Sequence, residues 1–400
     1  MPYRPSSVAG SLVVAVAVLV SAGCPSSPGK STCQVESVEM IAPHQAAAPS
    51  PSIMLLPDAR LDAVGDGFVL LGTDGANVLW AVVGKDGVIV GDEQSVPVPA
   101  HTAGPWFAVA GTNAPRDHVV IAFVAGAAGP AGDVELSTFS VQIDGTAPTL
   151  PVSSGRIPAA AQVTMMSGRG GLHAGIAWAE PGKTTISARI VGGNGVAVGN
   201  DLAVASVEDF NCLRFSPGKG DLTLGYVDLS GTPPAYNFVA TEIDAAGTLQ
   251  PFFKLSIGAQ PVESPGCVQL VPTDKGYGIA WHSVGVATYF SPYDSSSTHL
   301  QSYHVLYDVE ARPVPILGGL GWLGKNYAVV FARVEGAEVW PINAMGQKQG
   351  DLPVFPSAVG HTGALSTQPV GSVLYATYAD YADKVNLGAG SRQWVKVSCP

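Results

Sequence analysis

A short apolar segment that ends in small or acidic residues recurs seven times in this chain of 400 residues. The copies are spaced by roughly 40–55 residues, and each is rich in Val, Ile, Tyr, Phe and Trp between Gly, Asp and Pro turns. Helical periodicity is scarce, so we expect an all-β chain built from repeated units. The seven copies cover 67–74, 118–126, 173–180, 222–229, 276–283, 327–335 and 372–380.

In most units a second strand pattern follows and runs into a tight turn. Asp, Asn and Gly suit such turns because they tolerate positive φ and hydrogen-bond their own backbone. In the fifth unit the pattern assigns the second strand to 303–311, after a long connection. The residues predicted at the turn are Asp86, Asp144, Asp244, Asp308 and Asn343.

The period of the repeat is the one expected of four-stranded propeller blades. We therefore predict one seven-bladed β-propeller over residues 33–400, and two β-sandwich domains are the alternative. No WD, kelch or aspartate-box sequence is present, so the prediction depends on period and pattern.

The two ends of the chain are expected to meet in one blade. The seventh unit has three strands before the chain ends at 392–400, and the strand at 33–41 belongs to no other unit. A propeller completes its last blade with a strand from the other terminus, which removes an exposed strand edge. Antiparallel pairing places Cys33 opposite Cys399, and we expect a disulfide between them.

Cys212 and Cys267 are predicted to form a second disulfide. With Cys24 set aside, four cysteines remain, and an even number favours two disulfides in an exported protein. Four cysteines allow three pairings. The sequences NCLRFSPGKGDLTLGY and GCVQLVPTDKGYGIAW align so that each cysteine opens the first strand of its unit, which makes these two cysteines neighbours.

The N-terminal segment has the order of parts of an export signal. Arg4 is its only charge, 12–20 is wholly apolar, and small residues lead into Cys24. The apolar stretch is shorter than the ~20 residues of a spanning helix. The segment resembles a bacterial lipoprotein signal, and an ordinary cleaved secretion signal is the alternative. The resemblance implies a signal peptide over 1–23, and a lipidated cysteine and tether over 24–32 that anchor the protein to a membrane.

The charge of the chain argues against nucleic acid as a partner. Its formal net charge is −11, and only 13% of its residues are charged. Such a chain lacks a basic surface that would neutralise phosphates.

Two motifs suggest ligand chemistry, and each has a simpler interpretation. The sequence from Gly319 to Gly324 matches G-x-G-x-x-G, but a strand pattern follows where a dinucleotide site needs a helix. His304 and Asp308 share a strand face near other polar residues, but the spacing of a metal site is absent, so we read them as surface residues. The other polar residues there are Tyr293, Asp294 and His299. We expect no cofactor and no metal.

Catalytic signatures are also absent. The chain has no G-x-S-x-G sequence, and no free cysteine is expected to act as a nucleophile. Isolated Asp and Glu residues do not identify a carboxylate pair. We predict no catalytic residues.

Long connections between second and third strands mark the candidate binding face. They are expected at 228–237, 283–301 and 380–391, where tyrosines stand beside carboxylates. Tyrosine offers stiff apolar area and a hydroxyl, which suits recognition of sugars or peptides. The alternative is that these rings pack their own loops. The candidate ligand-binding residues are Tyr236, Tyr289, Tyr293, Asp294, Tyr381 and Asp383.

These features lead to one main hypothesis and two alternatives. The chain is expected to be an exported, monomeric protein, lipid-anchored in the cell envelope at the outer membrane or cell surface. There it would bind a protein or glycan without catalysis. The alternatives are a propeller hydrolase or lyase that acts on polysaccharide, and a scaffold in outer-membrane assembly.

Overall fold

The computed structural model describes most strands of the chain and some of the turns between them. The described residues are 34–41, 52–53, 56, 59–64, 67–74, 76–97, 102–112, 118–125, 133–142, 152–158, 162–167, 173–179, 185–192, 196–218, 221–230, 236–250, 253–258, 268–283, 287–294, 304–308, 316–333, 336–349, 354–356, 361–381 and 391–398. Among them, no helix is long and apolar enough to span a membrane. Ser31–Pro400 forms one compact unit.

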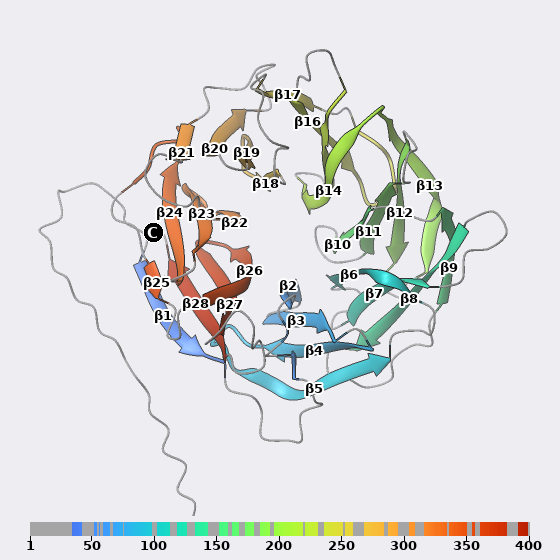
Figure 1. Ribbon diagram of the computed structural model, residues 1–400, viewed down its shortest axis with the longest axis horizontal. Coiled ribbons are helices and arrows are strands. Elements are labelled where there is room, and N and C mark those ends of the chain that lie inside the picture. Colours follow the sequence, from blue (N-terminus) through green and yellow to red (C-terminus); the bar gives the residue numbers. More distant parts are fainter. Residues whose placement is uncertain are drawn as a thin grey trace, which may run out of the picture. The chain divides into compact units, whose positions relative to one another are not determined.

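Nearly all of the described residues lie in β-strands, as the repeated pattern predicts. The strands form seven antiparallel sheets of four strands each within the described part of the chain (Figure 1). Sheet 1 contains β2 (Arg60–Val64), β3 (Gly67–Thr73), β4 (Asn77–Val83) and β5 (Ile89–Pro97). Sheet 2 contains β6 (Thr102–Thr112), β7 (His118–Ala125), β8 (Asp133–Gln142) and β9 (Val152–Pro158). Sheet 3 contains β10 (Gln162–Ser167), β11 (His173–Ala179), β12 (Thr185–Gly192) and β13 (Ala197–Ser206).

The remaining sheets follow in chain order, and only the last one takes a strand from elsewhere. Sheet 4 contains β14 (Phe210–Pro217), β15 (Leu222–Asp228), β16 (Tyr236–Ile243) and β17 (Phe253–Gly258). Sheet 5 contains β18 (Gln269–Pro272), β19 (Gly276–Ser283), β20 (Ala287–Asp294) and β21 (His304–Asp308). Sheet 6 contains β22 (Ile316–Trp322), β23 (Asn326–Arg333), β24 (Gly336–Asn343) and β25 (Val354–Pro356). Sheet 7 contains β26 (His361–Val370), β27 (Val373–Tyr381), β28 (Ser391–Ser398) and β1 (Gln34–Met40).

The first strands of successive sheets contact one another in chain order. β2 contacts β6, β6 contacts β10, β10 contacts β14, and β14 contacts β18. The series continues from β18 to β22 and from β22 to β26, and β26 in turn contacts β2. The first strand of each sheet therefore meets both neighbouring sheets.

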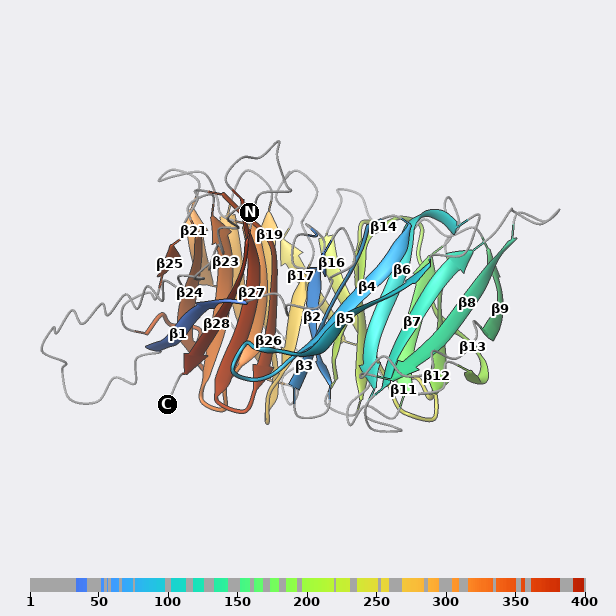
Figure 2. The same cartoon turned by 90° about the horizontal axis from the view of Figure 1, so that it is seen from below.

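The N-terminal strand completes the last sheet. β1 pairs antiparallel with β28, with Gln34 opposite Ser398, and Figure 1 shows β1 in blue alongside β28 in red. In the side view of Figure 2, β26, β27 and β28 run next to one another in the same sheet. The predicted pairing of the two chain ends is thus confirmed. Cys33 and Cys399 would follow in register, but both lie outside the described residues, so their disulfide stays a prediction.

Asp and Asn fix the predicted tight turns between third and fourth strands. The Oδ1 atom of Asp244 accepts from the backbone N–H groups of Ala246 and Thr248 at 3.0 and 2.8 Å. Gly247 then takes the positive φ of 77° that such a turn requires. Asn343 and Asp86 accept comparable bonds in their own turns. These turn predictions are confirmed, whereas Asp144 lies outside the described residues.

In the fifth unit the predicted second strand and its turn are wrong. The segment 283–301 was predicted as a connection, but it contains β20, the third strand of sheet 5. Asp308 consequently ends the fourth strand rather than occupying a turn after the third. Phe290 at the centre of β20 is fully buried, which explains why this segment pairs with β19 instead of forming a loop.

Apolar clusters fill the space between adjacent sheets. One cluster joins sheets 3 and 4 through Ala188, Phe215 and Leu224, all of which are buried. A second joins sheets 5 and 6 through Phe290 and Val329. Sheets 4, 5 and 6 each contribute apolar residues to two such clusters, which explains the near-continuous apolar strands of these sheets.

Candidate functional site

Two of the candidate binding tyrosines lie in strand β20 and stack on other rings. Tyr289 is stacked on Trp281 of β19, with ring centroids 5.4 Å apart. Tyr293 is stacked on Phe253 of β17 in the adjacent sheet, at 4.8 Å. Both tyrosines are half-buried, so part of each ring packs and part stays accessible. These contacts favour the alternative that the rings pack within the fold, while leaving accessible area.

The register of sheet 5 separates the candidate residues of β20 into two groups. Tyr293 and Asp294 pair with Tyr277 and Gly276, at the end of the sheet where β18 turns into β19. Tyr289 lies nearer the opposite end, where β19 connects to β20. The structure therefore does not bring Tyr293 and Asp294 to the connections between second and third strands.

Burial and the nearby Asp294 both raise the pKa of Tyr293. Burial raises the pKa of the Tyr293 hydroxyl, and the negative charge of Asp294 raises it further. The hydroxyl therefore stays protonated at neutral pH and is able to donate a hydrogen bond to a ligand.

The remaining candidates lie at strand ends or outside the described residues. Tyr236 begins β16, and Tyr381 ends β27, so both flank a connection between a second and a third strand. Asp383 lies outside the described residues. Of the residues expected in the loop cluster, Tyr236 and Tyr381 therefore lie next to the expected type of connection, at strand ends.

Two arginines on first strands form a feature that the sequence analysis did not single out. Arg60 begins β2 and is half-buried, whereas Arg214 in β14 is exposed. Arg214 stands between Leu213 and Phe215, which both pack into the cluster between sheets 3 and 4. The sequence feature that marks Arg214 is a charged residue between the apolar residues Leu213 and Phe215 in NCLRFSP.

An irregularity in β14 precedes Arg214. The pairing of β14 with β15 shifts between Asn211 and Arg214, as in a β-bulge. Cys212 within this bulge has a positive φ of 55°, which is uncommon for a residue other than glycine. From Arg214 onward the pairing with β15 is regular, and ordinary strand alternation places Leu213 and Phe215 on a buried side and the exposed Arg214 on the other.

Cys212 is buried on the side of β14 that faces sheet 5. It shares a cluster with Val268 and Leu270, which directly follow Cys267 in the chain. Cys267 itself lies outside the described residues. The predicted partnership of the two cysteines remains a prediction, and this shared cluster is compatible with it.

Buried polar pairs connect neighbouring sheets and serve the fold. His173 of β11 contacts the carboxylate of Asp221 beside β15, and both side chains are buried. The hydroxyl of Tyr277 in β19 donates to Glu242 of β16. Each pair joins two consecutive sheets, so its side chains satisfy one another rather than pointing to solvent.

A metal centre has no support among the residues that are described. Within them, no group of three or more His, Cys, Asp or Glu side chains is placed to hold a metal ion. His304 and Asp308 stand at opposite ends of β21, and His299 lies outside the described residues.

Comparisons with known proteins give no family. No protein-family model matches the chain, and no curated protein matches it. Solved structures resemble it at low identity. A protein of unknown function from Dyadobacter fermentans DSM 18053 shares 10% identity with a TM-score of 0.46, over 74% of this chain and 94% of that one. AofleA from Arthrobotrys oligospora shares 10% identity with a TM-score of 0.45, over 83% and 92%.

A third structure is longer than this chain. One of two prolyl endopeptidases shares 16% identity with a TM-score of 0.44, over 86% of this chain and 49% of its own. The present chain thus spans about half the length of that enzyme. Identities and TM-scores this low assign neither a family nor an activity.

Proposed function

We propose that this chain is a lipid-anchored, seven-bladed β-propeller that binds a protein or glycan in the cell envelope or at the cell surface. The observation that carries the proposal is the order of contacts among first strands, which runs from β2 to β26 and returns to β2. A propeller has this order of contacts, whereas two separate sandwich domains would divide it. Pairing of β1 with β28 supports the same architecture because it joins the two chain ends.

A binding role agrees with the side chains that remain accessible. Tyr289 and Tyr293 offer part of a ring each, and Arg214 offers a charged group on a first strand. The side chains of His173 and Asp221 contact each other and are buried, so this polar pair is not accessible to a substrate. Recognition without catalysis therefore accounts for the accessible groups more simply than an enzyme does.

The anchor is proposed from the N-terminal sequence and needs its own experiment. In the proposed mature protein, Cys24 bears the lipid and 25–32 is the tether. Mass spectrometry of the membrane-bound protein should find a lipid mass on the peptide that begins at Cys24. Cys24→Ser should release the domain from membranes or leave it unprocessed, and an unmodified Cys24 in the wild type would contradict the anchor.

Affinity capture tests the binding role. A soluble form that lacks Cys24 is used as bait with envelope extract, and we expect it to retain one specific protein or glycan. The Tyr236→Ala/Tyr381→Ala double variant should lose that ligand if the connections between second and third strands form the binding face. Met345→Ala is the matched control. Met345 is 65% exposed and lies on the turn between the third and fourth strands of sheet 6, away from the connections between second and third strands.

Three results would contradict parts of the proposal. Capture that persists in the tyrosine double variant rules out this face, while the binding role stands. A bait that captures nothing specific, together with release of products from a polysaccharide panel, favours the hydrolase or lyase. Recovery of outer-membrane assembly proteins as the specific partner favours the scaffold.

A further inference from the structure

The exposed large apolar side chains of the described residues share one position in the sheets. Each lies in, or within two residues of, a turn that joins a first strand to a second or a third strand to a fourth. Singly exposed apolar residues are ordinary on a protein surface, so their common position is the feature that needs a cause. The exposed fractions are 57% for Val88, 59% for Val90, 44% for Val196, 47% for Val198, 65% for Met345 and 37% for Val370.

These turns lie on one face of the molecule in six of the sheets. Between neighbouring sheets, residues in such a turn or no more than three positions from the strand end beside it contact one another, which links sheets 3, 4, 5, 6, 7 and 1 in order. The contacts join His173 to Asp221, Tyr277 to Glu242, Gly278 to Tyr327, Gly321 to Pro369, and Gln368 to Leu61. We call this side of the molecule the turn face. The connections between second and third strands leave from the opposite strand ends.

Lysines accompany the apolar side chains on the turn face. Lys85 is exposed in the same turn as Val88, and Lys348 is exposed after Met345, with its Nζ atom 4.6 Å from the ring centre of Trp340. Acidic residues are present too, and Asp86 accepts from the N–H of Val88 at 3.1 Å within its turn. Apolar side chains beside lysines suit the interface of a bilayer, where apolar groups meet acyl chains and ammonium groups meet lipid phosphates.

The N-terminal strand enters the fold at the turn face. β1 is the fourth strand of sheet 7, and its first residue Gln34 lies opposite Ser398 at the end of the third strand, β28. In the other sheets this place is the turn between third and fourth strands. An ion pair between Lys396 and Glu36 joins β28 to β1 near the same end. The chain that precedes Gln34 therefore leaves sheet 7 where the exposed apolar side chains of the other sheets lie.

The length of that preceding chain favours a membrane on the turn face. Nine residues, 25–33, separate Cys24 from Gln34. A flexible chain of that length spans on average about 17 Å between its ends. The seven residues of β1 span about 24 Å. A bilayer at the turn face is within the average reach of the tether, whereas a bilayer at the opposite face requires the tether to run back along a whole strand.

We propose that the turn face rests on the lipid bilayer that holds the anchor, with Val88, Val90, Val196, Val198 and Met345 at the boundary between headgroups and acyl chains. The inference rests on the proposed lipid anchor and gives the orientation of the domain on its membrane. Contacts too weak to hold a free protein on a bilayer are sufficient here, because the tether keeps the domain at a high effective concentration beside the lipids.

This orientation has a consequence for the proposed binding face. Sheets 1, 3 and 6 carry the five contacts and are not consecutive, so the contacts are spread over the turn face and oppose tilting of the domain. Tyr236 and Tyr381 flank connections at the opposite strand ends. They consequently point away from the bilayer, where a protein or glycan in the aqueous phase reaches them.

The experiment measures which face meets the bilayer. The processed, membrane-bound chain is reconstituted in vesicles of phosphatidylethanolamine and phosphatidylglycerol that contain a nitroxide-labelled phospholipid. An environment-sensitive fluorophore is attached through Met345→Cys or, as the matched control, through Ala76→Cys in the exposed turn between β3 and β4 at the opposite strand ends. The nitroxide should quench the fluorophore at position 345 at least about threefold more than at position 76. The unsubstituted chain gives the labelling background.

Serine variants test the apolar contact itself. Val88→Ser, Val90→Ser, Val196→Ser and Val198→Ser are combined in the chain labelled at position 345, and the excess quenching at that position should be lost. The same four valines replaced by isoleucine keep an apolar surface, so the excess quenching should persist. All four side chains are exposed, so neither set of substitutions alters the buried packing.

Three outcomes overturn the orientation. The first is equal quenching at the two positions, or stronger quenching at position 76. The second is quenching at position 345 that is unchanged in the serine variant. The third is a dimer that forms without vesicles and dissociates in the serine variant, which assigns the valines to contact with a second copy of the chain.

Failure of the anchor is a separate result. If mass spectrometry finds no lipid on Cys24, the same labelled chains are attached to vesicles through a hexahistidine tag in place of Cys24 and a nickel-chelating lipid. Excess quenching at position 345 on these vesicles supports the turn face as a bilayer-contacting surface, although the natural anchor is then removed. Equal quenching on them overturns the inference.

Discussion

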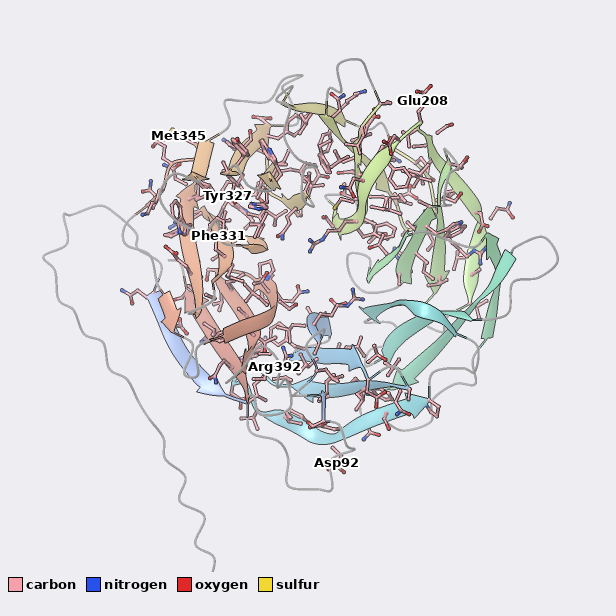
Figure 3. All side chains as sticks on the ribbon, in the orientation of Figure 1. Asp92, Glu208, Tyr327, Phe331, Met345 and Arg392 are labelled. Carbon is pink, nitrogen blue, oxygen red and sulfur yellow. The ribbon has the colours of Figure 1, made fainter. Side chains whose placement is uncertain are left out.

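Sheets 1 and 7 meet across the two ends of the chain, whereas the other neighbouring sheets follow each other along it. At the junction of sheets 1 and 7, side chains bond to backbone groups of the other sheet or its flanking segment. Arg392 is fully buried and donates to the carbonyl oxygen of Leu56 at 2.7 Å, and Ser366 accepts from Leu61. Figure 3 shows Arg392 between the strands of these two sheets.

The junctions between consecutive sheets add side-chain pairs to apolar packing, and they also contain single bonds to the backbone, such as the one from the N–H of Phe215 to Thr164 at 3.4 Å. Tyr226 packs in the cluster of sheets 3 and 4, and Tyr327 packs in the cluster of sheets 5 and 6. Figure 3 shows Tyr327 and Phe331 along β23, inside sheet 6. The polar contact between sheets 3 and 4 joins two side chains, His173 and Asp221.

The length of the intervening chain differs between the two kinds of junction. Consecutive sheets are joined by a short connection, so little loop-closure entropy opposes their packing. Leu61 and Ser366, which form a hydrogen bond, are 305 positions apart in the sequence. Their contact therefore has to offset a larger loop-closure entropy. Specific bonds to the backbone fix the register of this junction, which packing of apolar groups alone would leave less defined.

The largest expected effect comes from opening the junction of the chain ends. If Cys33 pairs with Cys399, the Cys33→Ser/Cys399→Ser variant should lose about 5 kcal/mol of unfolding free energy in the chain-entropy picture. A disulfide between Cys212 and Cys267 closes a shorter loop, so the Cys212→Ser/Cys267→Ser variant should lose about 4 kcal/mol of unfolding free energy. Denaturant unfolding under oxidising conditions measures both.

Peptide mapping supplies the control for this prediction. It should recover Cys33 linked to Cys399 and Cys212 linked to Cys267. A peptide that links Cys33 to Cys212 would refute the pairing, and equal stability of the closure variant and the wild type would show that the chain ends are held by β1 pairing alone.

Alkaline pH should instead attack the junctions between consecutive sheets. Burial raises the pKa of Tyr226 and of Tyr327 to about 12, from the ordinary tyrosine value of about 10. Each folded tyrosine thus keeps its proton at a pH where the unfolded chain has lost it. The stabilisation is complete below pH 10 and is lost as the pH rises from 10 to 12, at a cost of about 2–3 kcal/mol per tyrosine.

Phenylalanine variants isolate this effect. Tyr327→Phe should flatten the fall in unfolding free energy between pH 10 and 12, and ultraviolet titration of the wild type should show delayed ionisation of tyrosines that include Tyr226 and Tyr327. If Tyr226→Phe and Tyr327→Phe both retain the full pH dependence, the alkaline weakness lies elsewhere in the molecule.

Much of the fold follows from the sequence, and each feature that does not has a specific physical reason. The repeated strands and the pairing of the chain ends follow from period and from an unpaired strand at 33–41. Strand β20 was missed because Pro292 and several polar residues interrupt its pattern, although its Thr288 and Ser291 are fully buried. A strand or hairpin is normally visible as a pattern of apolar residues in the local sequence, and in β20 a proline interrupts this pattern.

Contacts between distant sheets left no local signal at all. The sequence places Arg392 in a strand but does not indicate that its guanidinium reaches Leu56. The candidate tyrosines were found because residue type alone suggested them, and their split between strand ends depends on register.

The smallest expected effect tests the bonds that hold sheet 1 to sheet 7. Arg392→Met removes the donor to the carbonyl oxygen of Leu56 while keeping a long apolar side chain, and should cost about 2 kcal/mol. The matched variant Arg189→Met removes a bidentate pair with Asp201, whose side chain is 44% exposed, and should cost about 1 kcal/mol or less.

Amide hydrogen exchange tells a local effect from a general one. In Arg392→Met the N–H groups of Leu56 and Ala59 should exchange about thirtyfold faster, which corresponds to 2 kcal/mol, while those of β12 stay as in the wild type. Exchange that rises equally in both regions would mean that the two junctions unfold together. In that case the backbone bonds of Arg392 stabilise the whole molecule, and the distinction between the two kinds of junction concerns geometry rather than stability.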